Sequence, residues 1–289
     1  MSTRIICVIA YVLLAPIIGG LFDGMDRKIS ARMQRRVGPP LLQPFYDVKK
    51  LFSKQWIAVT NDQTFMLLTY LILMIFTGGM FYSGSDILMC FFMLSTTGLF
   101  MFFTACITDS PYSSIGAQRE LIQEMSCEPA ILMTSLGFYL VEGTFEGSSI
   151  IHAKTSSLLY MPGLFAAYVF ILTIKMRKSP FDESTSHHPH QELVKGITSD
   201  LGSANLAIFQ IAEWYENVFL MGITALFIVN SSFAVSIPAA VLVVIAVYFL
   251  EILIDNTSAR VRWGTMLILS WGVTLAAGGL NLLILMIVK

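Results

Sequence analysis

Long apolar runs without a charged residue constrain the fold of this chain more than any other sequence feature. Five such runs contain at least 18 residues, at positions 5–22, 64–85, 87–108, 155–174 and 263–288. A run of about 18 uncharged apolar residues is long enough to cross a bilayer as a helix. Only 13% of the residues are charged, about half of the share usual in a soluble domain. We therefore predict an all-α integral membrane protein.

Two further helices are predicted in the uncharged stretch between Glu216 and Glu251, which is long enough for most of both. Asn-Ser-Ser at positions 230–232, followed by Pro238, predicts the turn that separates them. With these two helices the count of predicted spans rises to seven.

The remaining span, over residues 120–141, requires carboxylates inside the membrane. Its uncharged part, 129–141, is too short to cross a bilayer, so Glu124 and Glu128 must enter with it. The sequence thus predicts about eight transmembrane helices in a single polytopic membrane domain covering residues 1–289.

The distribution of basic residues predicts the orientation of these helices. With eight spans, 15 of the 18 Lys and Arg residues fall on the side opposite the termini. Cytoplasmic loops are rich in Lys and Arg, so this side is predicted to be cytoplasmic. We therefore expect a multi-pass protein of the cell membrane with both termini outside. The cytoplasmic loops are expected at about 23–62, 109–119, 175–203 and 255–262, and the basic side gives no reason to expect nucleic acid as a partner.

The first cytoplasmic loop contains a predicted amphipathic helix. After the break at Gly38-Pro39-Pro40, apolar residues recur at helical spacing over 41–52. We expect this helix to lie on the membrane surface, with its lysines toward water. It could anchor the protein, or it could dock a soluble partner, and the two roles are compatible. The candidate docking residues are Arg35, Arg36, Lys50 and, from the second loop, Arg119.

The loop at 175–203 is longer than a helix connection requires, and such loops are usually functional or disordered. It holds three histidines, His187, His188 and His190, beside possible acidic ligands. Pro189 splits the group, so we predict contact with a partner rather than a metal site. The four cysteines of the chain form no Cys-x-x-Cys pair, and they are not expected to hold an iron–sulfur cluster. We therefore expect no cofactor in this chain.

Acidic residues at or near membrane depth are the strongest candidates for function, because a carboxylate at the centre of a membrane helix costs about 3 kcal/mol. Glu120, Glu124 and Glu128 are spaced to share one helix face, and Arg119 could partner one of them. Glu120 is expected at the headgroup level. The deeper acids form a candidate proton path, with these members: Glu128, Glu213, Glu216, Glu124 and Glu251.

Asp255 follows Glu251 by one helical turn, at the cytoplasmic end of the seventh predicted helix. We expect it, like Glu120, to be an ordinary charge at the headgroup level. Glu251 lies deeper in the same helix and therefore stays among the candidates for proton coupling.

Four groups of residues occur in a distinctive order along the chain. The first contains Asp26-Arg27-Lys28, Met33-Gln34-x-Arg36-x-Gly38-Pro39, Leu42-Gln43-Pro44, Asp47 and Lys50; the second contains Gly116-Ala117-x-Arg119, Gln123, Ser126 and Glu128; the third contains Ser179-Pro180-Phe181-Asp182 and Glu192-Leu193-Val194-x-Gly196; the fourth is Ala212-Glu213. In order and spacing they resemble the membrane heel subunit of respiratory complex I and of energy-converting nickel–iron hydrogenases, whose fold has eight membrane helices.

Two segments, 184–192 and 251–262, resemble the Ech-type hydrogenase branch of this family rather than complex I. In the stretch Asp200-Leu201-Gly202-Ser203, the two small residues stand in the reverse of the order usual in complex I members. This difference disfavours a quinone pocket. The leading prediction is therefore the membrane subunit of an Ech-type hydrogenase, and a complex I-type subunit that couples quinone reduction to proton pumping is the alternative.

The resemblance implies the role of the chain and its partners. The hydrogenase large and small subunits and iron–sulfur subunits would form a peripheral arm with a nickel–iron centre and 4Fe–4S clusters, fed by ferredoxin. This chain would be non-catalytic: it would anchor the arm and couple proton reduction to H⁺ or Na⁺ translocation beside an antiporter-like membrane subunit and membrane lipid. The residues expected at the junction with the arm are Asp182, Glu192 and Asp200, with His187, His188 and His190.

Two functions from other classes are alternatives to that of a coupling subunit. A stand-alone transporter would show repeated halves, and no clear internal repeat is present. A passive anchor for a cytoplasmic enzyme would not need acids inside the membrane.

Overall fold

The fold is all-α in the residues that the structure describes. The structure is a computed structural model, and it describes residues 2–181, 184 and 195–288. Its longer helices are α1 (Ser2–Met33), α2 (Gln43–Phe52), α3 (Asn61–Tyr82), α4 (Ile87–Cys106), α5 (Pro111–Glu142), α7 (Pro162–Lys175), α8 (Ser203–Leu226), α9 (Phe233–Thr257), α10 (Trp263–Val273) and α11 (Leu280–Val288). The short α6 (Gly147–Ile151), η1 (Ser157–Leu159) and η2 (Gly196–Thr198) lie between them. A π-helical segment, Thr274–Gly279, joins α10 to α11.

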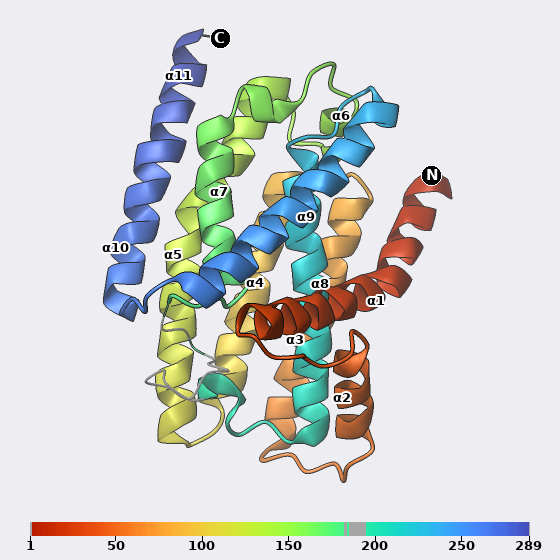
Figure 1. The fold of residues 1–289 in the computed structure, drawn as a ribbon, viewed down its shortest axis with the longest axis vertical. Helices are drawn as coiled ribbons and strands as arrows, with labels where there is room; N and C mark the ends of the chain where they lie inside the picture. Colours follow the sequence, from red (N-terminus) through yellow and green to blue (C-terminus); the bar gives the residue numbers. More distant parts are fainter. Residues whose placement is uncertain (1, 182–183, 185–194, 289) are drawn as a thin grey trace.

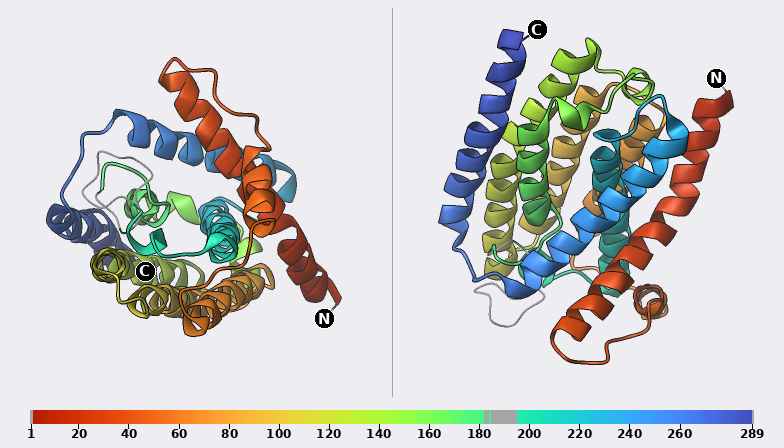
Figure 2. Two further views of the ribbon diagram at one scale, coloured as in Figure 1. Left: turned by 90° about the horizontal axis from the view of Figure 1, so that it is seen from below. Right: turned by 45° about the horizontal axis from the view of Figure 1, so that its top comes forward.

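The helices form a bundle in which two members run obliquely (Figure 1). α3, α4, α5, α7 and α8 stand roughly parallel, whereas α1 and α9 cross the bundle at a slant. α8 contacts α1, α2, α3 and α9, so it lies at the centre of the packing. Figure 2 shows α10 and α11 at the edge of the bundle, where they contact α5 and α7.

Five helices are long and apolar enough to cross a membrane: Arg4–Met33, Asn61–Tyr82, Ile87–Cys106, Phe233–Thr257 and Trp263–Val288. The chain is thus a multi-pass membrane protein. α7 is apolar but has only 14 residues, which makes it about 21 Å long. α5 and α8 are long, but α5 carries five charged residues and α8 carries two. The predicted number of eight spans therefore stays a prediction.

Several helix ends differ from those expected from the apolar runs. α1 continues to Met33, beyond the run that ends at residue 22, because its charged residues pair along the helix; Arg27 Nε lies 3.0 Å from Asp23 Oδ1. α5 begins at Pro111, a residue well suited to a first helical position, rather than near residue 120. The expected fifth span starts late, at Pro162.

The turn expected at residues 230–232 is present, since α8 ends at Leu226 and α9 begins at Phe233. Pro238 was expected to belong to this turn, and that was wrong: it lies inside α9. Asn230 holds the turn instead, because its backbone oxygen accepts a hydrogen bond from Ser236 Oγ at 3.2 Å.

The predicted amphipathic helix exists as α2 and packs part of its apolar side on α8, while its position at the membrane surface stays a prediction. Val48 and Phe45 pack on Trp214 of α8, and the rings of Phe45 and Trp214 are 5.2 Å apart. The predicted exposure of the lysines is confirmed, since Lys49, Lys50 and Lys54 are all exposed. The apolar side of α2 thus covers α8.

Close contacts of α1 with its neighbours depend on glycine. A Cβ atom added at Gly24 would lie 2.0 Å from the backbone oxygen of Leu41, and one at Gly19 would lie 2.5 Å from that of Trp214. Only a residue without a side chain permits such an approach. α1 is therefore held tightly against α8 and the start of α2.

Candidate functional site

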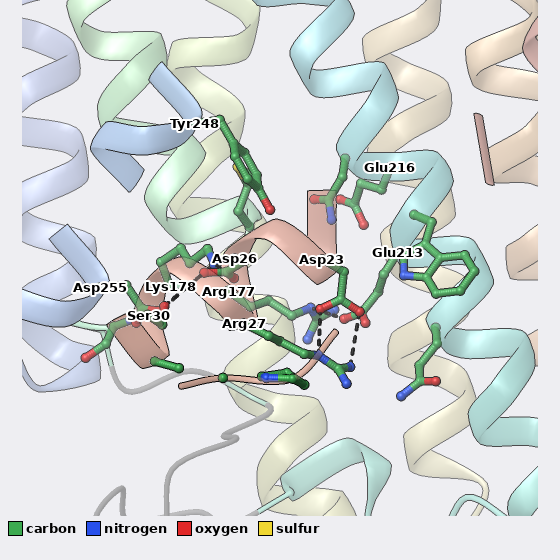
Figure 3. Close-up of a pocket in the computed structure, with 18 of the residues that line it drawn as sticks. Asp23, Asp26, Arg27, Ser30, Arg177, Lys178, Glu213, Glu216, Tyr248 and Asp255 are labelled. Carbon is green, nitrogen blue, oxygen red and sulfur yellow. Dashed lines mark hydrogen bonds and ion pairs between the residues drawn. The ribbon is translucent and has the colours of Figure 1, made fainter. Parts of the chain in front are cut away.

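A cavity of about 690 Å³ lies between α1, α8, α9 and residues 175–179 (Figure 3). Ten charged residues line it, five acidic and five basic: Asp23, Asp26, Glu213, Glu216, Asp255, Arg27, Arg36, Lys175, Arg177 and Lys178. Pockets for organic ligands are mostly apolar, whereas this lining suits water and mobile protons. The cavity is therefore the candidate functional site.

Arg177, directly after α7, binds acids from two other helices. Its guanidinium donates to both oxygens of Glu120 on α5, at 2.9 and 3.2 Å, and its Nε lies 3.2 Å from Glu213 Oε1 on α8. The ring of Phe209 lies under the guanidinium, 5.4 Å from its centre. Burial alone would lower the pKa of Arg177, but the nearby carboxylates of Glu120 and Glu213 raise it above its ordinary value. Arg177 therefore stays charged and neutralises this part of the site.

Glu120 is buried and paired with Arg177, so it is not the ordinary solvated charge that was expected, and its level in the membrane stays a prediction. The loop after α7 covers it, and the hydroxyl of Ser184 donates to the same carboxylate that Arg177 binds.

Glu216 connects this cavity to a second, smaller one. It lines both, and its Oε2 accepts a hydrogen bond from the hydroxyl of Tyr70 at 3.4 Å. The second cavity has a volume of about 10 Å³, roughly the space of one water molecule, and Glu124 lines its other side. Lys175 donates to both carboxylate oxygens of Glu124 at 2.6 Å. We call Glu120, Glu124, Glu213 and Glu216 the acid row.

On the α9 side of the cavity, Lys178 joins two other helices. Its ammonium contacts the carboxylate of Asp26 on α1 and lies 4.0 Å from Asp255 Oδ2 on α9. The backbone N–H of Ser179 also donates to Asp255, at 3.0 Å. Burial would lower the pKa of Lys178, but Asp26 and Asp255 raise it above its ordinary value. We call Asp26, Lys178 and Asp255 the lysine clamp.

Asp255 was expected to be an ordinary charge at the headgroup level, and the lysine clamp shows instead that it has protein partners. Glu251, one helical turn earlier on α9, is fully buried. Neither of its carboxylate oxygens has a hydrogen-bond partner among the residues that the structure describes.

Glu128 lies apart from the acid row, although its spacing placed it on one face with Glu120 and Glu124. It is exposed on the outer side of α5, whereas Glu120 is buried and Glu124 is largely so. The eight residues from Glu120 to Glu128 turn the helix by about 800°, so the two side chains diverge by about 80°. The structure therefore brings together four predicted or considered acids and leaves Glu128 facing outward.

The residues predicted for docking and for the junction lie at the surface or outside the described part of the chain. Arg35, Arg36 and Lys50 are exposed, and Arg119 is half-buried. Asp200 accepts a hydrogen bond from Ser113 Oγ at 2.5 Å, which ties the loop before α8 to the start of α5. The junction residues Asp182, Glu192, His187, His188 and His190 lie outside the described residues.

Seven of the ten charged residues that line the cavity were not among the predicted site residues: Asp23, Asp26, Arg27, Lys175, Arg177, Lys178 and Asp255. Three of them could have been found from the run Lys175-x-Arg177-Lys178, which comes directly after an apolar span. Buried acids require cations, and these are the cations nearest to a span in the loop. Among the described residues, no group of three or more His, Cys, Asp or Glu side chains is placed to hold a metal ion.

Comparison with known proteins identifies relatives along almost the whole chain. Hydrogenase-4 component C of Escherichia coli K12 is 26% identical over 286 residues, which cover 89% of each chain. A subunit of the NADH-quinone oxidoreductase of Aquifex aeolicus VF5 is 26% identical over 240 residues, covering 72% of this chain and 70% of that protein.

A solved structure shares the fold. A chain of the archaeal membrane-bound sulfane sulfur reductase, a respiratory membrane complex, superimposes with a TM-score of 0.85 at 20% identity, covering 98% of this chain and 99% of that one. The sequence pattern of the NADH dehydrogenase family matches residues 4–286. On this match over almost the full length, the chain belongs to the NADH dehydrogenase family.

Proposed function

We propose that the chain is the membrane subunit of an Ech-type energy-converting hydrogenase, coupling ferredoxin-linked proton reduction to H⁺ or Na⁺ translocation. The likeness to a hydrogenase component from Escherichia coli supports this assignment. The nickel–iron centre and 4Fe–4S clusters would lie in the hydrogenase large and small subunits and the iron–sulfur subunits. An antiporter-like membrane subunit would be the neighbour within the membrane.

The observation that carries the proposal is the continuity between the charged cavity and the acid row. Glu213 and Glu216 line the cavity, and Glu216 and Glu124 line the small cavity behind it. A proton that enters the cavity with water can thus reach three carboxyl groups in turn. Lys175 and Arg177 contact members of the same row, so a displacement of the segment that bears them would change the charge felt by each acid.

The proposal includes eight membrane helices with both termini outside. α5, α7 and α8 would join the five helices that are long and apolar enough to span. Their buried charges support this, since Glu120 and Glu124 of α5 and Glu213 of α8 face partners inside the bundle rather than lipid.

Quinone reduction is the second candidate, because relatives include a subunit of a NADH-quinone oxidoreductase. The charged lining of the cavity disfavours the binding of a quinone. An apolar isoprenoid quinone would have to displace the hydration of charged side chains, and burying them without compensation is costly.

The first test is the nickel content of the intact complex, purified gently through this subunit. About one nickel atom per complex, with hydrogen produced from reduced ferredoxin, is the expected result. A complex without nickel that retains its peripheral arm and reduces a quinone would overturn the hydrogenase assignment.

The second test addresses the acid row in the complex reconstituted into vesicles. Glu216→Gln keeps the shape of the side chain but removes the proton-binding carboxylate. We expect hydrogen production to continue while ion translocation falls at least tenfold. Glu146→Gln, at an exposed position before α6, is the matched control and should translocate ions normally. Full translocation by Glu216→Gln would contradict the role of the row.

A further inference from the structure

Glu251 lies close to the charged cavity in α9 but is not one of the residues that line it. Tyr248 and Asp255, one helical turn before and after it, both line the cavity. Positions three and four residues apart share a helix face, so Glu251 lies on the face of α9 that is turned toward the cavity. Its carboxylate is nevertheless fully buried, with no hydrogen-bond partner for either oxygen among the described residues.

A buried carboxylate of this kind requires either a nearby cation or a proton, because an isolated buried charge is very costly. The charged groups that act on Glu251 are Lys178 and Asp255. α9 also packs on α1, which contributes Asp26, and on α7 and α8. Lys178 is therefore the cation that acts on Glu251, and in the structure its ammonium contacts Asp26 and lies 4.0 Å from Asp255.

Lys178 can change partners without a change in the fold. Its ammonium contacts Asp26 but remains 4.0 Å from Asp255, which is too far for a direct hydrogen bond. The lysine side chain has four flexible methylene groups that allow such a shift. Movement toward α9 would bring the positive charge closer to Asp255 and Glu251 and away from Asp26.

We propose that Glu251 is a second proton-binding site, separate from the acid row, and that Lys178 controls its occupancy by moving between Asp26 and α9. When Lys178 lies on Asp26, Glu251 takes a proton from a hydronium ion in the cavity and leaves a water molecule there. When Lys178 moves to α9, Glu251 returns the proton to cavity water. This inference rests on the proposed function for its purpose, since ion coupling is what would use such a site.

The segment directly after α7 would link Glu251 to the acid row. Arg177 and Lys178 are consecutive residues, yet Arg177 binds Glu120 of the acid row and Lys178 binds Asp26 on the opposite side. Figure 3 shows Lys178, Asp26 and Asp255 on one side of the cavity and Glu213 and Glu216 on the other. One displacement of the segment after α7 would therefore change both acid sites at the same time.

The test is infrared difference spectroscopy on the purified intact complex, recorded on reduction and reoxidation. A protonated carboxylic acid has its own carbonyl band, and we expect one such band to appear or disappear with reduction. Glu251→Gln should remove this band, and Glu146→Gln should leave it unchanged. Lys178→Met should keep Glu251 protonated in both redox states, so the band should be lost from the difference spectrum but remain in the absolute spectrum of each state; Lys178→Arg should keep the redox response.

Two outcomes would overturn the inference: a wild-type complex without a redox-dependent carboxyl band, or an unchanged band in Glu251→Gln. If Glu251→Gln does not assemble, Glu251→Asp serves instead. It keeps a carboxyl group in an altered position, so the band should shift, and an unshifted band would count against Glu251. The nickel content and ion translocation of the wild-type complex test the proposed function separately, since neither depends on this band.

Discussion

At the scale of single residues, Arg177 shows a conflict between backbone and side chain. It has a φ of 53°, in the left-handed region, directly after the end of α7. Helices commonly end with glycine at this place because glycine adopts that conformation without strain. Here the guanidinium is needed to bind Glu120 and Glu213, and its ion pairs outweigh the backbone cost.

The replacement Arg177→Gly tests which effect is larger. Glycine would relieve the backbone by about 1 kcal/mol. Loss of one member of a buried ion pair costs about 3–5 kcal/mol, so we expect a net destabilisation of about 2–4 kcal/mol. Thermal unfolding in detergent measures it. Arg35→Gly is the matched control, because Arg35 has a φ of 60° but is exposed. It should leave stability unchanged or raise it slightly, and equal effects of the two replacements would refute the ion-pair argument.

At the scale of helices, the packing of α1 determines the wall of the cavity. Gly24→Ala would place a methyl group 2.0 Å from the backbone oxygen of Leu41, so the chain before α2 must shift. Overpacking of this kind costs about 1–3 kcal/mol. Gly272→Ala on α10 is the control, since no atom lies within 4 Å of the added methyl group. Alanine is the better helix former by about 1 kcal/mol, so this control should be neutral or stabilising. Equal melting temperatures for the two variants would contradict the close approach of α1.

The short helix α7 depends on a residue far away in the sequence. The side-chain oxygen of Asn281 accepts hydrogen bonds from the N–H groups of Gly163 and Leu164, at 3.1 and 3.2 Å, and its amide donates to the backbone oxygen of Tyr160. First-turn N–H groups have no partner within their own helix.

We therefore expect Asn281→Leu to destabilise the start of α7 by about 1–2 kcal/mol, the usual effect of losing a cap. Hydrogen exchange of residues 163–166 measures this locally, and their protection should fall at least fivefold. Leu283→Ala, at an exposed position on α11, is the control and should not alter exchange there. Unchanged protection in Asn281→Leu would show that the cap contributes nothing.

Helix identity could be predicted from the sequence better than helix length. Uncharged runs mark the ends of α3 and α4 to within three residues, because lipid selects for such runs. The same criterion stops α1 at residue 22, since it cannot recognise a helix that continues with charged residues paired along and beyond it. The acids of the site could be predicted because acids within spans are rare, but their ion pairs could not. The cations lie at the end of α7 and directly after it, and the contact of Arg177 with Glu120 joins residues far apart in the sequence.

At the scale of the whole molecule, the outer side of α5 indicates where another subunit lies. Its exposed residues follow helical spacing, and they are Met125, Glu128, Leu132, Leu136 and Tyr139. Four of them suit lipid, but an ionised carboxylate in a membrane helix costs about 3 kcal/mol and normally has a polar partner. The relatives are components of multisubunit complexes, so a membrane subunit can supply that partner.

This arrangement predicts that assembly covers Glu128. In a chain whose exposed thiols are removed by Cys7→Ser and Cys106→Ser, a membrane-permeant maleimide should label Glu128→Cys readily in the isolated subunit. In the intact complex the rate should fall at least tenfold, because a partner helix that satisfies a carboxylate must approach to hydrogen-bond distance and exclude the reagent. Glu146→Cys controls for general access. If Glu128→Cys reacts equally fast in both states, the outer side of α5 faces lipid or water, and its carboxylate must be accommodated without a partner subunit.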